Sequence, residues 1–292
     1  MTKITFPIAI GIALSLTMTA LADFPGDFKA ATELYSKKEY PQAQEAFMKL
    51  AEAAPTPKSK SECLARAALS LDRQGRYDQA LELARKIEVK PIAVNCQMEI
   101  MIANKKTKEL IEAFKGEDMG AWPDYIIHRG FYNRGTACRL AGEREAAAKD
   151  LEKAVENSDT AGNFQVQAAH ELAGVYHALK NDDNELAAHR KVLAQKMTAI
   201  YIYYVSALAA PEILIKQGKP DEALVELKRF DPLPPDGPTA PYKARALVMY
   251  GDIYAKQDKK DMALASYKDA LKSGLNKTDT DRVNKTIEEL SK

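Results

Sequence analysis

Small residues recur along this chain of 292 residues at a regular distance. Five short polar turns are each followed by an alanine, and twelve positions before each alanine another small residue usually stands. A glycine inside a helix costs about 1 kcal/mol relative to alanine, so it is tolerated where its missing side chain lets two helices pack closely. The pattern therefore predicts a series of helical hairpins. The aligned residues are Ala43, Ala80, Ala147, Ala223 and Ala263, preceded by Ala31, Ala68, Gly135, Pro211 and Gly251.

Two intervals between aligned alanines are nearly twice as long as one repeat. One runs from Ala80 to Ala147, and the other runs from Ala147 to Ala223. Each interval is expected to contain a degenerate copy of the hairpin. Ala187 divides the second interval into two parts of similar length, and it is interpreted as the aligned alanine of the fifth hairpin.

The last copy resembles the tetratricopeptide repeat (TPR) family in the order of its bulky, small and aromatic residues. These residues are Leu247, Tyr250, Gly251, Tyr254, Ala263, Tyr267 and Ala270. The resemblance extends over essentially all of the chain after Ala22. It implies an all-α fold, a right-handed superhelical α-solenoid of about seven TPR-like helical hairpins with a C-terminal capping helix. The expected repeats are 24–57, 61–90, 92–115, 124–157, 164–195, 200–230 and 242–274, and the capping helix is expected over 279–291.

Two stretches interrupt the regular pattern, residues 115–124 and 231–238. Both contain Gly and Pro in numbers that no helix tolerates, so they are expected to be loops between hairpins, with hinges as the alternative. Because repeats continue on both sides of each stretch, residues 23–292 are interpreted as one solenoid rather than as separate domains.

The N-terminal segment, residues 1–22, has the layout of a secretory signal peptide. One early cation, Lys3, precedes an apolar run. The run ends with Ala20, Leu21 and Ala22, a small residue on each side of Leu21, so cleavage is expected after Ala22. An uncleaved membrane anchor is the alternative, although the run contains Pro and Gly and makes a poor span. Residue 23 is Asp rather than the Cys of a bacterial lipoprotein. The expected location is periplasmic or secreted, with no integral membrane span after signal cleavage.

Charge and reactive residues argue against several classes of function. Lys and Arg number 42 against 41 for Asp and Glu, so no overall field draws the chain to nucleic acid. The four histidines lack the spacing of a helical metal pair, and no phosphate-binding glycine loop or nucleophile elbow is found in the sequence. We therefore expect no metal, no cofactor, no catalytic residue and no enzymatic activity. Cys63, Cys96 and Cys138 lie in apolar helical patterns and are expected to behave as small hydrophobic residues.

The family resemblance also implies where a partner would bind. In TPR proteins the first helices of the hairpins line a concave groove, which the second, fifth, ninth and twelfth residues of each unit face. Two arginines and a tyrosine on one such helix suit an extended peptide or an acidic segment, through forked hydrogen bonds and aromatic contact. The candidate partner-binding residues are Arg129, Tyr132, Thr136 and Arg139 in the fourth repeat and Arg245 and Asp252 in the seventh.

The sequence thus predicts a non-catalytic extracytoplasmic scaffold or adaptor that binds a protein or an extended peptide of the cell envelope in its groove. Two alternatives stay open. One is a protein that associates with cell wall or saccharide, with or without catalysis, and its acidic pair would be Asp72 with Glu62 or Asp252. The other is a structural subunit that forms homo-oligomers through its exposed end repeats.

Overall fold

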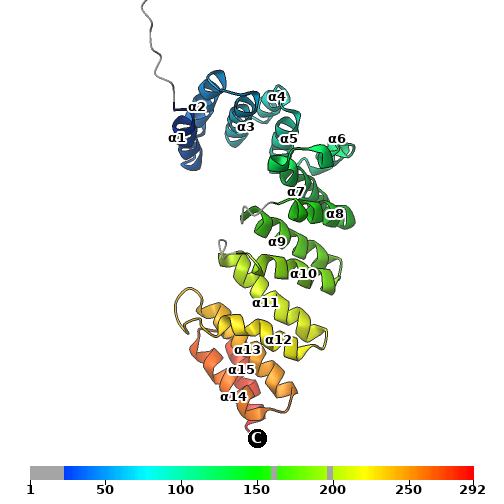
Figure 1. Ribbon diagram of the computed structural model, residues 1–292. Helices are drawn as coiled ribbons and strands as arrows, with labels where there is room; N and C mark the ends of the chain where they lie inside the picture. Colours follow the sequence, from blue (N-terminus) through cyan, green and yellow to red (C-terminus); the bar gives the residue numbers. More distant parts are fainter. Residues whose placement is uncertain (1–22, 159–162, 196–199) are drawn as a thin grey trace, which may run out of the picture. The chain divides into compact units, whose positions relative to one another are not determined.

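A computed structural model describes residues 23–158, 163–195 and 200–292, so the predicted signal peptide lies outside the described residues. The described part of the chain contains fifteen α-helices, two short 3-10 helices and no strand. The helices are α1 (Phe24–Ser36), α2 (Tyr40–Glu52), α3 (Pro57–Arg73), α4 (Tyr77–Arg85), α5 (Lys90–Ala103), α6 (Thr107–Phe114), α7 (Asp124–Ala141), α8 (Arg144–Glu156), α9 (Asn163–Ala178), α10 (Asp182–Leu193), α11 (Ile200–Lys216), α12 (Pro220–Leu227), α13 (Ala240–Lys256), α14 (Lys260–Lys272) and α15 (Lys277–Leu290) (Figure 1).

Seven short turns join these helices in pairs, and all seven have the same backbone conformation. The residue two places before each second helix lies in the left-handed region, with φ between 56° and 87°. A left-handed residue just after a helix is a common way to end it, and glycine adopts this conformation most readily. The seven residues are Lys38, Gly75, Lys105, Gly142, Lys180, Gly218 and Asp258.

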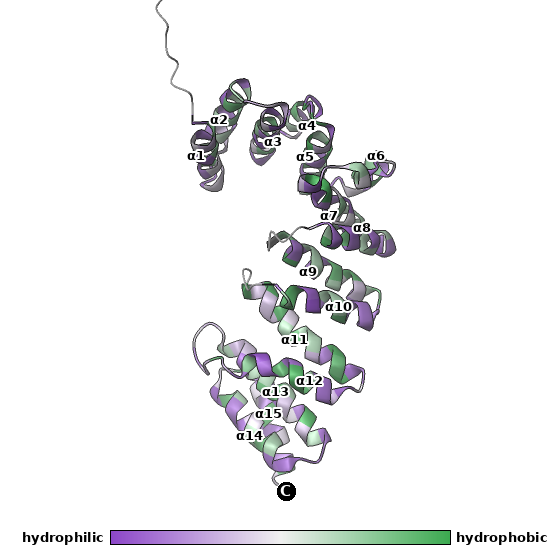
Figure 2. Ribbon diagram, viewed as in Figure 1, coloured by the Kyte–Doolittle hydropathy of each residue, from purple (hydrophilic) through white to green (hydrophobic). Residues whose placement is uncertain are grey.

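These turns set the register of each hairpin. The aligned alanines of the first, second, fourth, sixth and seventh hairpins all lie five places after the left-handed residue, and all five are fully buried. Hydrophobic and hydrophilic residues are interspersed along the helices, as expected of elements that bury one face (Figure 2). The predicted all-α solenoid of helical hairpins is confirmed.

Gly135 and Gly251 each lie against a large side chain of the second helix of their hairpin. A Cβ atom on Gly251 would lie 2.5 Å from Cε1 of Tyr267, and one on Gly135 would lie 2.9 Å from Cγ of Leu151. Each glycine therefore leaves a space that a bulky residue of the second helix fills. In the sixth hairpin this position holds Pro211, which is buried inside α11 without ending the helix.

The interpretation of Ala187 as an aligned alanine is wrong, because this residue is exposed. The side chain of Asn181 caps α10 by accepting a hydrogen bond from the Asn184 amide at 3.2 Å, so the helix begins at Asp182. The residue five places after Lys180 is Glu185, and it is 7% exposed. The fifth hairpin thus has a carboxylate where five other hairpins have alanine.

The chain divides into two compact units between Ala93 and Val94, inside α5. The first described unit contains α1–α4, with a core around Ala43, Phe47 and Cys63. The stretches 115–124 and 231–238 both lie inside the second unit, so neither coincides with this division. In the earlier stretch, Trp122 is buried and packs so closely on α7 that a Cβ atom on Gly130 would lie 2.4 Å from its ring.

A buried ion pair joins the two helices of the fourth hairpin. Nε and Nη2 of Arg134 on α7 donate to the two carboxylate oxygens of Asp150 on α8, at 2.7 and 2.8 Å. Nη1 of Arg134 also donates to the carbonyl oxygen of Phe114 at 3.2 Å, at the end of α6. The hydrogen bonds to Asp150 raise the pKa of Arg134. One side chain therefore connects three successive helices of the second unit.

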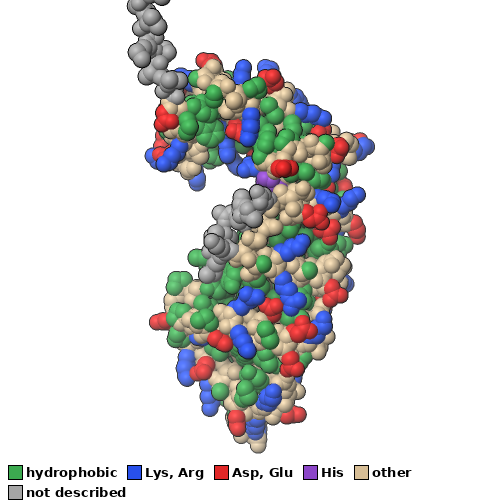
Figure 3. All heavy atoms as spheres, viewed as in Figure 1, with side chains coloured by type: hydrophobic (Ala, Val, Ile, Leu, Met, Phe, Trp, Pro, Cys, Tyr) green, Lys and Arg blue, Asp and Glu red, His purple; other side chains and the backbone are tan. Residues whose placement is uncertain are grey.

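The last helix, α15, covers the end of the seventh hairpin. Its Val283 is fully buried in a cluster with Val248, Ala263 and Tyr267. On the face drawn in Figure 3, side chains of both charge signs are interspersed over the described surface. The three cysteines are buried, and no described helix is long and apolar enough to span a membrane.

Candidate functional site

The first helices of the last four hairpins all belong to the second unit, so their equivalent positions can be compared directly. The register of the turns extends the predicted groove positions from the fourth and seventh repeats to the fifth and sixth. We call the full set the first-helix face. It consists of Arg129, Tyr132, Thr136 and Arg139 on α7; Gln167, His170, Gly174 and His177 on α9; Val205, Leu208, Glu212 and Ile215 on α11; and Arg245, Val248, Asp252 and Ala255 on α13.

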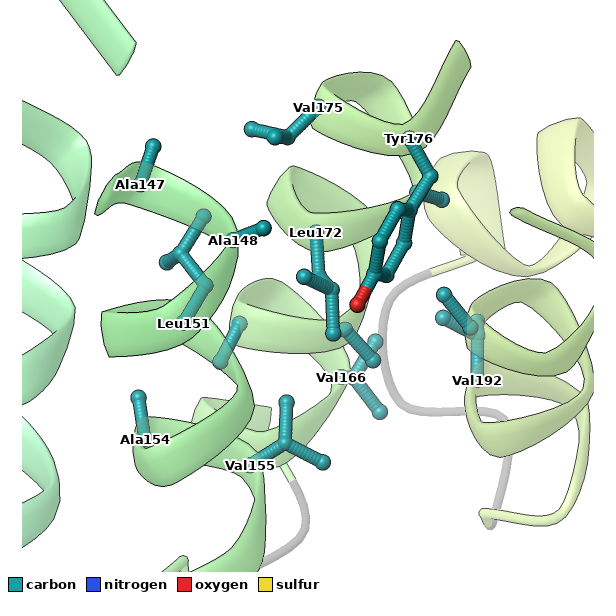
Figure 4. Close-up of a cluster of buried hydrophobic side chains, with 14 of the residues drawn as sticks. Ala147, Ala148, Leu151, Ala154, Val155, Val166, Leu172, Val175, Tyr176 and Val192 are labelled. Atoms are coloured by element: carbon teal, nitrogen blue, oxygen red, sulfur yellow. The ribbon is translucent and has the colours of Figure 1, made fainter. Parts of the chain in front are cut away.

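A hydrophobic core holds α9 between α8 and α10 beneath this face. Leu151 and Val155 of α8, Leu172 and Tyr176 of α9 and Val192 of α10 belong to one cluster, in which the ring of Tyr176 extends toward α8 (Figure 4). All five side chains are buried. Because these apolar contacts fix the rotation of α9, its residues His170, Gly174 and His177 are turned toward the first-helix face.

Two pockets open on the first-helix face. The first, here the fifth-repeat pocket, has a volume of about 620 Å³ and lies among α7, α9, α10 and α11. Its walls include Arg139, His170, Glu171, Gly174, His177, Glu185, His189, Val205 and Ala209. The second pocket, of about 490 Å³, is lined by residues of α11, α13 and α15 that include Glu212, Arg245, Asp252 and Arg282.

Ion pairs connect successive helices along the face. Nε of Arg139 on α7 lies 2.5 Å from a carboxylate oxygen of Glu171 on α9. Arg245 on α13 lies 3.4 Å from Glu212 on α11. The Asp252 carboxylate of α13 accepts a hydrogen bond from the Tyr267 hydroxyl at 2.6 Å and lies 3.4 Å from Arg282 of α15. Two predicted partner-binding arginines, Arg139 and Arg245, are therefore already neutralised within the chain.

The other predicted residues of the fourth repeat differ in their surroundings. Arg129 is exposed, and Thr136 is buried. Tyr132 is half-buried, with its ring edge-on to Phe164 of α9 at a centroid distance of 5.0 Å, and burial raises its pKa. Of these four residues of α7, Arg139 lines the fifth-repeat pocket.

Glu185 has an unusual environment for a carboxylate. Its Oε1 lies 3.1 Å from Nδ1 of His177 and 3.9 Å from Nε2 of His189. His189 is 6% exposed, and its other ring nitrogen lies 3.0 Å from the Ser206 hydroxyl of α11. Burial, with smaller contributions from His170 and His177, lowers the pKa of His189 to about 4, so this imidazole is neutral at pH 7. In the described part of the chain, no lysine or arginine forms an ion pair with Glu185.

Gly174, in the middle of α9, also lacks a structural explanation of the kind that applies to Gly135 and Gly251. No atom outside the helix lies within 4 Å of the position that its Cβ would take. A glycine in a helix costs about 1 kcal/mol relative to alanine, and here no close packing offsets it. The residue leaves the backbone of α9 open to the fifth-repeat pocket.

The sequence prediction places no partner-binding residue in the fifth repeat, because alignment on Ala187 shifts the register of that repeat by two positions. Glu185 lies midway between Ala147 and Ala223 in the sequence, as expected of the aligned position of one intervening repeat. This equal spacing is the sequence feature that identifies Glu185 as the aligned residue of the fifth repeat. Among the residues described, no group of three or more His, Cys, Asp or Glu side chains is placed to hold a metal ion.

Comparison with known proteins agrees with this description of the fold. Residues 244–273 match the sequence profile of the tetratricopeptide repeat. The C-terminal part of a TPR repeat-containing protein from Cytophaga hutchinsonii superposes with a TM-score of 0.58, at 18% sequence identity, over 87% of this chain and 98% of that one. A TPR protein from Thermus thermophilus gives a TM-score of 0.48 at 20% identity, over 64% of this chain and 98% of that one.

A third structure, a TPR protein from Parabacteroides merdae, gives a TM-score of 0.41 at 14% identity, over 92% of this chain and 99% of that one. No curated protein matches the chain in sequence. One segment of the chain is thus similar in sequence to a tetratricopeptide repeat, and the chain shares the helical fold of the Cytophaga protein.

Proposed function

We propose that this protein is a non-catalytic extracytoplasmic scaffold that binds an extended peptide segment of a partner protein along the first-helix face. TPR proteins generally bind protein partners and act without catalysis. The observation that carries the proposal is the fifth-repeat pocket, an opening of about 620 Å³ bounded by three first helices and α10. A pocket of this size can hold one or two side chains of a peptide that crosses the helices.

The face has the features that peptide recognition needs. Apolar residues such as Val205 and Ala209 offer area for burial, and charged residues such as Arg139 and Glu171 offer hydrogen bonds to a peptide backbone or side chain. The alternative of a saccharide-binding protein with an acidic pair gains no support from Asp252, because Tyr267 and Arg282 already engage this carboxylate.

Affinity capture with a charge-swapped variant tests the proposal. The immobilised chain is incubated with an envelope extract of its source organism, and bound proteins are identified by mass spectrometry. The variant Arg139→Glu/Glu171→Arg keeps an ion pair between α7 and α9 but reverses its direction, so the fold is retained while a partner that contacts either residue is lost. Arg85→Glu, at an exposed position of α4, is the control for charge change alone. Capture of no protein above background, or equal capture by all three chains, contradicts the proposal.

The extracytoplasmic location is part of the same proposal. Asp23, the residue after the predicted cleavage site, caps α1 by accepting a hydrogen bond from the Gly26 amide at 3.2 Å, so cleavage after Ala22 would leave this cap intact. Expression of the complete chain in a bacterium with two membranes, followed by osmotic shock and N-terminal sequencing, should recover a periplasmic protein that begins at Asp23. A chain that stays in the cytoplasm with residues 1–22 attached would contradict this part of the proposal.

A further inference from the structure

The buried carboxylate of Glu185 requires an explanation. It occupies the hairpin position that holds a buried alanine in five other repeats, and it is 7% exposed. Burial of a charge is unfavourable unless the charge is paired and hydrogen-bonded. The hydrogen-bonding partner of Glu185 is Nδ1 of His177, whose own side chain is 78% exposed. A large acidic residue thus occupies a position for which a methyl group suffices in five other hairpins.

The charges around Glu185 leave it without a fixed counterion. From α7 and α9, Arg139 and Glu171 neutralise each other. From α11, Glu212 faces Arg245, and its pKa is raised by burial and also by Glu185. The remaining titratable groups are His170, His177 and His189, and Arg144, an exposed residue at the start of α8 that also lines the pocket. Exposed charge is screened by water and salt far more strongly than buried charge, so the field of Glu185 dominates inside the pocket.

The residues that line the pocket also suit a long side chain with a charged end. Besides Glu185, its walls include the small or apolar residues Ala173, Val205 and Ala209. Lysine and arginine bury an aliphatic stem against apolar surface while the charged head reaches a carboxylate. Gly174 lies on the same wall, with no atom outside its helix within 4 Å of its Cβ position. The main chain of a ligand can therefore approach α9 more closely there than at any residue with a side chain.

From these observations we propose that the fifth-repeat pocket binds a lysine or arginine side chain of the partner segment, that Glu185 is its counterion, and that the partner backbone passes over Gly174. This assignment depends on the proposed function, because it names the residue class that the first-helix face recognises. His177 and His189 orient the Glu185 carboxylate and leave its charge available to the ligand.

A random library of twelve-residue peptides displayed on phage tests this proposal with the complete chain as the target. Selected peptides should share a lysine or arginine at one aligned position. A synthetic copy with norleucine at that position should bind about 10-fold or more weakly, the expected effect of losing a hydrogen-bonded charge. Glu185→Gln should weaken binding of the parent peptide by a similar factor and should leave binding of the norleucine peptide nearly unchanged. Glu145→Gln, at an exposed position of α8, is the matched control and should bind like the original chain.

Gly174→Ala provides a second test that does not depend on the fold of the Glu185 variant. A methyl group at this position meets no atom of the chain, so the thermal midpoint should not fall, yet the peptide should bind at least several-fold more weakly.

The outcomes separate the two proposals. Selected peptides that lack a shared basic residue, or that bind the Glu185→Gln chain and the original equally well, overturn the role of Glu185. The proposal that the first-helix face binds peptides still stands in that case if the charge swap at Arg139 and Glu171 abolishes binding of the selected peptides. Failure of the library to yield any peptide that binds the chain overturns peptide binding and, with it, the role of Glu185.

Discussion

At the scale of single residues, Gly174 and Gly251 show how the same residue type serves two purposes in equivalent helices. Gly251 is buried, and the Tyr267 ring occupies the space beside it. Gly174 is exposed and faces open space. The first glycine is explained by packing inside the chain. The second is not, which is why we assign it to contact with a ligand.

This difference predicts opposite effects of the same substitution on stability. Gly251→Ala should lower the free energy of unfolding by about 1–2 kcal/mol, because the overpacking penalty exceeds the gain in helix propensity. Gly174→Ala should raise it by up to about 1 kcal/mol, since only the gain in helix propensity applies. Urea denaturation followed by circular dichroism measures both. Equal effects of the two substitutions would show that the close contact with Tyr267 is not present in solution.

At the scale of single elements, α10 shows what could and could not be predicted from the sequence. The recurring alanines predicted the hairpins, since a small residue is needed wherever two helices cross closely. They failed in the fifth hairpin, where Glu185 takes the place of the alanine and the turn residue is Lys180 rather than a glycine. An alignment on alanine then selects Ala187, two positions away and on the exposed side of the helix. The predicted residues of the fourth and seventh repeats stay predictions as partner-binding residues, because no ligand contact tests them.

The packing of α10 against α9 and α11 also predicts how stability depends on pH. The pKa of His189 is lowered to about 4 in the folded chain, whereas an exposed histidine titrates near a pH of about 6.5. The unfolded chain therefore binds more protons between these two values. The stability from neutral His189 is complete above about pH 6.5 and is lost as the pH falls toward 4, by up to about 1.4 kcal/mol per pH unit.

The variant His189→Asn isolates this effect, because asparagine can still form a hydrogen bond to Ser206 but does not titrate. Chemical denaturation at several pH values between 4 and 7 should give a flatter dependence for the variant than for the original chain. His128→Asn, at a half-buried position of α7, serves as the comparison. If the free energy of unfolding changes with pH equally in the His189 variant and the original chain, the pKa of His189 is not lowered by folding and the prediction is wrong.

At the scale of the whole molecule, each hairpin of a repeat protein contacts its neighbours in sequence, so a local change should have local effects. Loss of one partner of a buried ion pair is strongly destabilising, by about 3–5 kcal/mol. Asp150→Asn should therefore accelerate hydrogen exchange in α6, α7 and α8, which Arg134 connects, and should leave α1 and α2 in the first unit unchanged. Mass spectrometry of peptides from exchanged protein measures this. Uniform acceleration across the chain would indicate a single cooperative unit instead.

The ion pairs along the first-helix face have a kinetic consequence. Because Arg139, Arg245 and Asp252 are matched by opposite charges of adjacent helices, the face projects little long-range field into the surrounding solution. Encounter with a partner then proceeds without electrostatic steering, at about 10⁵–10⁶ M⁻¹s⁻¹. Differences in affinity between competing partners would accordingly arise from how long each remains bound, and added salt would change the association rate only slightly.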